Sequence, residues 1–179
     1  MKRFWTEAKA APAEGGFGVL LDGRPVRTPA RAALVVPGAA LAEAIAGEWQ
    51  AVDGALNPRA MPLTGFANAA IDRVAPDAAA FAARLAAYGE SELIAYRADG
   101  PDSLLAAQAQ AWDKWVDWFA RRYDAALTLT SGILHVAQPP ETLARIRAAF
   151  AGFSPFQLAA LDPVVGITGS AVLALAVAE

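Results

Sequence analysis

The chain has 179 residues, of which 56% are hydrophobic and 18% charged, and its formal net charge is −3. This composition is typical of a globular protein and excludes a disordered chain. The sequence contains no cysteine, which excludes disulfides and thiolate sites. It contains a single histidine, so we expect no metal and no cofactor. It has no run of Lys or Arg, so we expect no nucleic-acid partner.

The first forty residues predict an antiparallel β meander. Gly16–Leu21 is an apolar strand that runs into Asp22-Gly23, a residue pair that tolerates the positive φ angles of a two-residue hairpin. Arg24–Pro29 is the expected return strand, held to an edge by its two prolines. Ala32–Val36 is expected as a third short strand, and Arg3–Ala10 is expected to pair at the start.

Two helices are predicted to pack on this meander. Leu41–Val52 carries apolar residues at helical spacing and turns Trp49 inward. Thr64 is expected to cap a second helix, whose buried stripe is Phe66, Ala67, Ala70, Ile71 and Val74. Pro76 cannot continue that helix, so we place the end of an N-terminal α+β domain at residue 75.

Residues 76–179 predict an all-α domain. Five helices are expected, together with a short element at Glu92–Tyr96 and an extended pair within Leu127–Val136; the helices are Asp77–Tyr88, Asp102 to about Ala125, Pro140–Phe150, Ser154 to a break at Asp162-Pro163, and Gly169–Ala178. Val164–Ala178 is almost uncharged, but it is short for a bilayer span of about 20 residues. We therefore expect a buried helix and no stable membrane insertion.

An aromatic stripe marks the longest of these helices. Trp112, Trp115, Val116, Trp118, Phe119 and Tyr123 fall within an arc of roughly 160°. Burial of three indoles is worth on the order of 15 kcal/mol at most, so the core or a partner must cover them. We expect Trp49, Trp112 and Trp115 in the core and Trp118 at the exposed edge.

The sequence offers no catalytic apparatus. It lacks Gly-x-Ser-x-Gly, and its one possible base, His135, lies in an apolar stretch where a packed or surface role is expected. The glycine-rich segments at residues 15–18 and 166–170 lack the Lys of a phosphate cradle. Asp72 stands at a helix end where it opposes the helix dipole, so we expect a cationic partner such as Arg24, Arg27 or Arg97, either as an ion pair between domains or within a recognition surface.

Several strings, taken in order, resemble one protein family. They are Leu21–Pro29, Glu48-Trp49, Met61–Asp72, Ala95–Ala98, Gln108 with Trp112-Asp113, and Gln138–Pro140. Together they resemble the assembly chaperones that escort the α subunit of F(1), the catalytic head of ATP synthase, in mitochondria and α-proteobacteria. Gly65 stands where members of this family often carry Arg, and the family typically continues past residue 179 into an acidic tail that contains Trp.

The resemblance implies an N-terminal α+β domain, a helical C-terminal domain and no enzymatic activity. It implies an ATP-independent chaperone that binds the unassembled α subunit and prevents its aggregation until the β subunit arrives. For a bacterial member we expect a monomer in the cytoplasm; organellar members act in the mitochondrial matrix.

Such a chaperone must cover apolar client surface yet release it, which favours a site with a polar rim. We expect this site in a groove between the two domains, with client-binding residues Arg24, Arg27, Phe66, Asp72, Tyr96, Arg97 and Trp118. Two alternatives stay open: a small hydrolase or ligand-binding enzyme with a site at the domain junction near Asp72 and Arg97, and a membrane-associated adaptor using Val164–Ala178.

Overall fold

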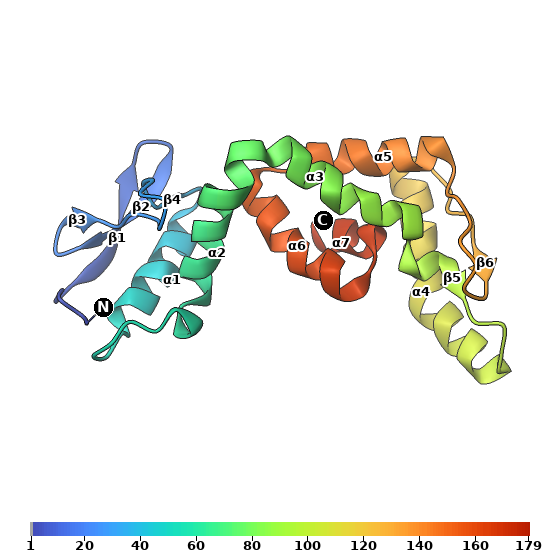
Figure 1. Ribbon diagram of the computed structural model, residues 1–179, viewed down its shortest axis with the longest axis horizontal. Helices are drawn as coiled ribbons and strands as arrows, with labels where there is room; N and C mark the ends of the chain where they lie inside the picture. The colour runs from blue at the N-terminus through green and yellow to red at the C-terminus, as the bar shows by residue number, and fades with distance from the viewer. Residues whose placement is uncertain (1) are drawn as a thin grey trace. The chain divides into compact units, whose positions relative to one another are not determined.

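A computed structural model describes residues 2–179. The chain forms two compact units, Met1–Pro76 and Asp77–Glu179 (Figure 1). The first holds all the antiparallel strands together with packed helices, and the second consists mainly of helices. The predicted α+β class is confirmed.

A small antiparallel sheet forms one layer of the N-terminal unit. Strand β1 (Ala8–Ala13) pairs with β2 (Gly16–Leu21), and β2 pairs on its other side with β3 (Arg24–Pro25) and β4 (Val35–Val36). The expected hairpin is confirmed: φ is 48° at Asp22 and 80° at Gly23, as a two-residue turn of primed type requires.

The sheet departs from the expected meander at two places. The return strand pairs with β2 only over Arg24–Pro25, and β4 pairs with the earlier part of β2, with Phe17 opposite Val36. The first strand starts at Ala8 rather than at Arg3. Arg3 instead uses its guanidinium to donate hydrogen bonds to four backbone carbonyls, those of Trp5, Thr6, Gln50 and Val52, and so ties the N-terminal segment to the end of the first helix.

Helix α1 (Ala39–Gln50) covers one face of the sheet, and α2 (Pro62–Ala69) packs on α1 (Figure 1). The α2 backbone continues as a π-helical turn, Ala70–Val74, and a 3-10 turn, Ala75–Asp77; another 3-10 turn, Pro58–Ala60, precedes it. The core contains Val19, Ile45 and Trp49, which confirms the inward direction of Trp49.

The C-terminal unit contains five helices among its described residues. They are α3 (Ala78–Ala86), α4 (Asp102–Tyr123), α5 (Pro140–Ala151), α6 (Pro155–Thr168) and α7 (Ala171–Val177). Two 3-10 turns, Ala87–Ser91 and Leu93–Ala95, connect α3 to β5 (Tyr96–Arg97), which pairs in parallel with β6 (Thr130–Ser131). Side chains cap the starts of α3 and α6: Asp77 accepts from the Ala80 N–H, and Ser154 forms a capping box with Gln157.

The break expected at Asp162-Pro163 is wrong. Helix α6 continues through Pro163 to Thr168 and ends at Gly169, whose φ of 63° is a left-handed cap. Pro163 lies on the exposed side of the helix, where water can satisfy the carbonyl that its missing N–H leaves free. No helix within residues 2–179 has the length and apolar character needed to cross a bilayer.

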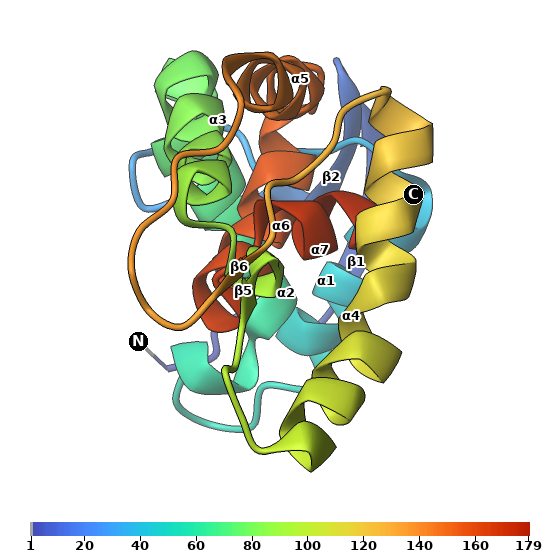
Figure 2. The same ribbon diagram turned by 90° about the vertical axis from the view of Figure 1, so that its right-hand side faces the viewer.

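Helix α7 lies at the centre of the C-terminal unit and contacts α4, α5 and α6 (Figure 2). Its first turn meets a fully buried carboxylate, Glu92, which accepts a hydrogen bond from the Val172 N–H at 3.1 Å. Burial raises the pKa of Glu92 from 4.5 to about 7, while hydrogen bonds from Ser170 and neighbouring backbone N–H groups oppose the rise. The sequence did not predict that the Glu92 carboxyl group is buried.

The aromatic stripe is less covered than expected. Phe119 is the one fully buried side chain of α4, while Trp112, Trp115 and Trp118 are all half-buried. The assignment of Trp112 and Trp115 to the core is therefore wrong, because the short α7 covers only one side of a much longer helix.

Candidate functional site

The N-terminal unit carries two adjacent apolar hollows of about 350 Å³ each. Arg27 and Trp49 line both of them, so the hollows share a wall. The first, which we call hollow A, is completed by Thr28, Pro29, Leu56, Pro58, Met61, Thr64, Gly65 and Asn68. The second, hollow B, is completed by Phe4, Leu21, Arg24, Pro25 and Val26.

Asp72 holds the loop that forms one side of hollow A. Its carboxylate accepts hydrogen bonds from the Thr28 hydroxyl at 2.6 Å and from the Ala30 N–H at 3.0 Å. The expected ion pair of Asp72 with Arg24, Arg27 or Arg97 is wrong: none of these arginines forms one with Asp72 among the residues that the structure describes. Hydrogen bonds from a hydroxyl and a backbone N–H satisfy the carboxylate in place of a cation.

Glu48 holds the opposite side. Its carboxylate leaves α1 and accepts from the N–H groups of Leu63 and Thr64 at 2.7 and 2.8 Å, and from the Thr64 hydroxyl at 2.7 Å. The prediction that Thr64 caps α2 is therefore wrong. The helix begins at Pro62, and the Glu48 carboxylate from α1 accepts hydrogen bonds from the free N–H groups of its first turn.

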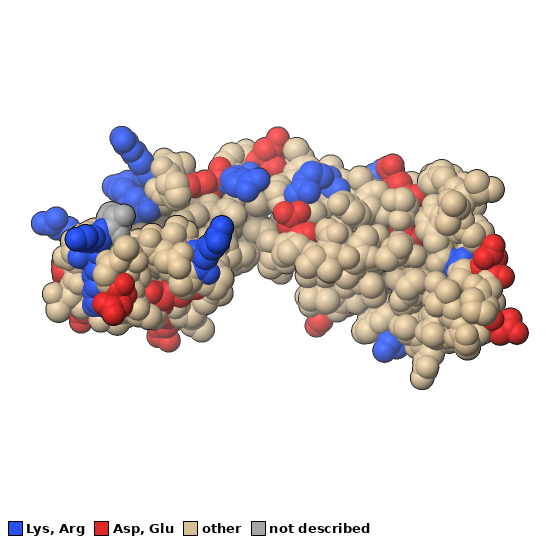
Figure 3. All heavy atoms as spheres, turned by 60° about the horizontal axis from the view of Figure 1, so that its bottom comes forward, with Lys and Arg blue, Asp and Glu red and all other residues tan. Residues whose placement is uncertain are grey.

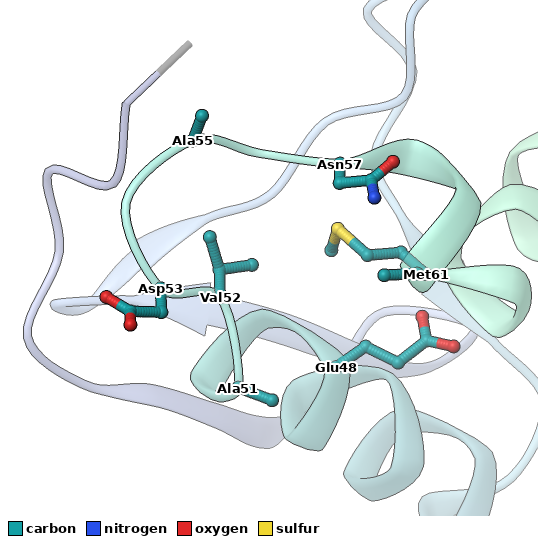
Figure 4. A pocket seen from close by; sticks show the side chains of 8 residues that line it. Glu48, Ala51, Val52, Asp53, Ala55, Asn57 and Met61 are labelled. Carbon is teal, nitrogen blue, oxygen red and sulfur yellow. The ribbon is translucent and has the colours of Figure 1, made fainter.

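A third hollow, of about 200 Å³, lies on the other side of this cap. Figure 4 shows Glu48 reaching from α1 toward the turn that holds Met61, with Val52 and Asn57 nearby. Met61 is buried and lines both this hollow and hollow A. Met61 is therefore common to the walls of the two hollows, and Glu48 binds the two residues at the start of α2 that follow Pro62.

The acidic and basic side chains around hollows A and B differ in their interactions with the rest of the protein. Asp22, Glu48 and Asp72 all accept hydrogen bonds from the protein's own backbone. Arg24 and Arg27 are exposed, and neither forms an ion pair with a described residue. On the face shown in Figure 3, basic side chains stand out from the N-terminal unit. The rim of the hollows thus carries two guanidinium groups outside any ion pair among the described residues, and that of Arg27 donates one hydrogen bond to the Arg31 carbonyl at 2.9 Å.

The aromatic stripe forms a second exposed surface, in the C-terminal unit. Trp118 packs edge-on against Trp115 and Tyr123, at ring distances of 6.5 and 5.8 Å. Lys114 lies 5.1 Å from the centre of the Trp115 ring. Half-buried indoles with cations beside them form the kind of amphipathic surface that is common at protein interfaces.

Tyr96 and Arg97 lie next to this stripe. The Arg97 guanidinium pairs with Asp113 at 2.8 Å and lies 5.5 Å from the centre of the Trp112 ring, so the Asp113 carboxylate is engaged. The Tyr96 hydroxyl contacts Nδ1 of His135 at 3.2 Å, and this His is exposed, which confirms a surface role.

An apolar loop extends beside Tyr96. Ile133 is 96% exposed and Leu134 is 80% exposed, and the loop follows β6, the partner strand of Tyr96. These neighbouring exposed apolar side chains are a candidate for contact with a partner. The sequence predicts an extended pair within Leu127–Val136 and the surroundings of His135, but it carries no signal that Ile133 and Leu134 are exposed.

The predicted contact residues thus fall into two groups. Arg24, Arg27, Phe66 and Asp72 belong to the N-terminal unit, where both arginines border the hollows and Phe66 is half-buried on α2. Tyr96, Arg97 and Trp118 belong to the C-terminal unit. A groove that joins the two groups stays a prediction. Among residues 2–179, no group of His, Cys, Asp and Glu side chains could hold a metal ion.

Comparison with known proteins identifies the family. A family model described as ATP12 chaperone protein matches residues 2–120, well over half of the chain. The chain belongs to the ATP12 chaperone family. This confirms the resemblance to the chaperones of F(1) assembly that the sequence strings indicated.

Solved structures agree with the family assignment. The chain is similar to Atp12 from Paracoccus denitrificans, with 48% identity over 98% of this chain and 76% of that one, and a TM-score of 0.95. A point mutant of that protein matches equally well, with 75% of its chain covered. A protein from Agrobacterium tumefaciens is 40% identical over 98% of this chain and 66% of that one, with a TM-score of 0.90.

Three of the six strings that resemble the family contribute residues to hollow A. Thr28 and Pro29 come from the hairpin string, Trp49 from the Glu48-Trp49 string, and Met61 and Asn68 from the long string that contains α2. Segments far apart in the chain thus form one concave surface. The family resemblance and the candidate site rest on the same residues.

Proposed function

We propose that this protein is an ATP-independent chaperone for assembly of the F(1) sector of ATP synthase. It binds the unassembled α subunit and prevents its aggregation until the β subunit pairs with it. The observation that carries this proposal is the ATP12 family match together with 48% identity to Atp12 over 98% of the chain.

The exposed surfaces support a role in binding a polypeptide. Hollows A and B offer apolar walls under a cationic rim, and the C-terminal unit offers half-buried indoles beside an exposed apolar loop. Apolar contact surrounded by polar groups gives binding that is specific yet reversible without nucleotide. We propose that Arg24, Arg27, Phe66, Tyr96, Arg97 and Trp118 contact the client, and that Asp72 contributes by holding Thr28.

The protein is proposed to act as a monomer in the bacterial cytoplasm. A monomer leaves both surfaces free for one client chain. Light scattering coupled to gel filtration should give the mass of a single chain, 18.6 kDa, and a mass of twice this value would contradict the monomer.

A refolding assay tests the function. The isolated α subunit, diluted from denaturant, should scatter less light as this chaperone is added, with full suppression near equimolar amounts and no effect of ATP. Addition of the β subunit should then release the α subunit into an αβ complex. If a folded preparation neither suppresses aggregation nor co-purifies with the α subunit, the proposed function is wrong.

The apolar loop beside Tyr96 gives a sharper test. Replacing both Ile133 and Leu134 by Ser should lower the affinity for the α subunit several-fold, because exposed apolar contact is lost. The free energy of unfolding should change by less than about 0.5 kcal/mol, since both side chains lie in water. Affinity is measured by biolayer interferometry with immobilised α subunit.

The matched control replaces two other exposed residues, Ile167 and Val177, by Ser. They are 86% and 67% exposed and lie on other elements of the same unit. Equal loss of affinity in both double variants would show that the loop has no special part in binding.

A further inference from the structure

We infer that hollows A and B hold an extended segment of the client in which large apolar side chains stand next to an Asp or Glu. This inference rests on the proposed function and names the part of the client that the N-terminal unit takes. Four properties of the two hollows lead to it: their spacing, their unpartnered polar atoms, their charge and their rigidity.

The spacing fits an extended chain. The hollows share Arg27 and Trp49 as a wall, and each measures about 350 Å³, which is within the range of sites for drug-sized groups. In an extended strand, alternate side chains project from one face about 7 Å apart. Two adjacent hollows with a common wall can therefore receive two side chains from one segment.

Two polar atoms of hollow A lack partners. Nε1 of Trp49 and Oδ1 of Asn68 are buried, and neither forms a hydrogen bond with a described residue. Trp49 is 8% exposed, and both side chains line the hollow. A buried polar atom without a partner costs about 1–3 kcal/mol. A peptide backbone carries a carbonyl for the indole N–H and an N–H for the amide oxygen, which a purely apolar occupant lacks.

The charge at the rim selects an acidic neighbour. Arg27 borders both hollows and Arg24 borders hollow B, while the nearby carboxylates of Glu48 and Asp72 are engaged by the protein's own donors. Arg27 donates one hydrogen bond, from Nη1 to the Arg31 carbonyl, and forms no ion pair with a described residue. A guanidinium without an ion pair favours a carboxylate that it can bind through two N–H groups. We therefore assign the occupant an Asp or Glu beside its apolar side chains, rather than a Lys or Arg.

The walls are held in place before any client binds. Glu48 fixes the start of α2, Asp72 fixes the hairpin loop, and the Trp5 ring packs edge-on against Trp49 at 5.2 Å. A site that needs little reordering binds with a smaller loss of entropy. The open side is at Gly65, where an added Cβ would meet nothing within 4 Å.

Gly65 provides the test. Gly65→Leu places a side chain at the lining of hollow A, and it should raise the Kd for the isolated α subunit by roughly tenfold, as the loss of a binding pocket does. Folding should be unharmed or improved, because Leu favours an exposed helix position by about 0.5–1 kcal/mol over Gly. Binding is followed by interferometry and folding by urea titration.

Gly47→Leu is the control. Gly47 is also an exposed helical glycine with nothing within 4 Å of an added Cβ, but it lines neither hollow. This variant should bind the α subunit within about twofold of the parent protein. If the parent captures the α subunit and Gly65→Leu captures it equally well, the inference is wrong while the proposed function stands. If the parent itself captures no α subunit, the proposed function is wrong.

Overlapping 15-residue peptides that cover the α subunit test the chemistry of the occupant. On an array, the parent protein should bind peptides with a large apolar residue within two positions of Asp or Glu. Arg27→Glu should shift this preference toward Lys and Arg, whereas Arg145→Glu, an exposed change on α5, should leave it unchanged. Binding of basic or purely apolar peptides by the parent protein would overturn the inference.

Discussion

Replacing Glu92 by Gln should flatten the pH dependence of stability between pH 5 and 8. Burial raises the pKa of this carboxyl from 4.5 to about 7 in the folded chain, so between these values the folded state holds a proton that the unfolded state has lost. The free energy of unfolding of the parent should therefore fall as the pH rises through this window, by up to about 3 kcal/mol.

Gln removes this loss because it has no charge to bury, while its carbonyl oxygen can still accept from the Val172 N–H. The variant should be more stable than the parent at pH 8, by roughly 6–12 °C in Tm, with a smaller difference at pH 5. Circular dichroism melts at four pH values measure this. Glu90→Gln is the control, since Glu90 is exposed and pairs with Arg147 at the surface. Parallel Tm profiles for the parent and Glu92→Gln would contradict the prediction.

Replacing Glu48 by Ala should destabilise the protein by about 3 kcal/mol, because a charged acceptor of three hydrogen bonds and the cap of α2 are lost together. Glu48→Gln should cost less, since one oxygen can still accept. The measurement is urea unfolding monitored by far-UV circular dichroism.

The control for Glu48 is Glu43→Ala on the same helix. Glu43 is exposed, so its loss should change the free energy of unfolding by less than about 0.5 kcal/mol. The affinity of Glu48→Ala for the α subunit should also fall, because Met61 and Thr64, which line hollow A, depend on this cap. A Glu48→Ala protein as stable as Glu43→Ala would show that the three hydrogen bonds contribute nothing.

Local chemistry made several elements predictable. Asp22-Gly23 specifies a hairpin because both residues tolerate positive φ, and Asp77 and Ser154 specify helix starts because their side chains accept from N–H groups three residues on. The cap of α2 was not predictable in this way. Glu48 lies 15 residues before the N–H group of Leu63 that it binds, and only the packing of α1 on α2 brings them together.

The exposure of the aromatic stripe on α4 could not be predicted from the energy of burying its indoles. The apolar area of three indoles correctly indicated that something must cover them, but the area does not say how much of the covering the chain itself provides. Helix α7 has seven residues and α4 has 22, so one helix cannot bury the whole arc of the other. The remaining exposure of Trp112 and Trp115 depends on this difference in length.

The candidate site was predicted in part. Arg24 and Arg27 were placed in a recognition surface and do border the hollows, whereas Trp49 was assigned only to the core. Trp49 is indeed buried, but it also lines both hollows. A helical pattern gives the direction in which a side chain points, and it cannot show that the packing around it leaves a cavity.

The five indoles are divided between the two units: Trp5 and Trp49 pack edge-on in the first, and Trp112, Trp115 and Trp118 lie along α4 in the second. Each half of the molecule therefore carries its own intrinsic fluorophores. In a protein with Phe at the three α4 positions, tryptophan emission excited on the red edge of the absorption band, where Tyr88, Tyr96 and Tyr123 absorb little, would come only from the N-terminal pair, so its quenching would report directly on occupancy beside Trp49.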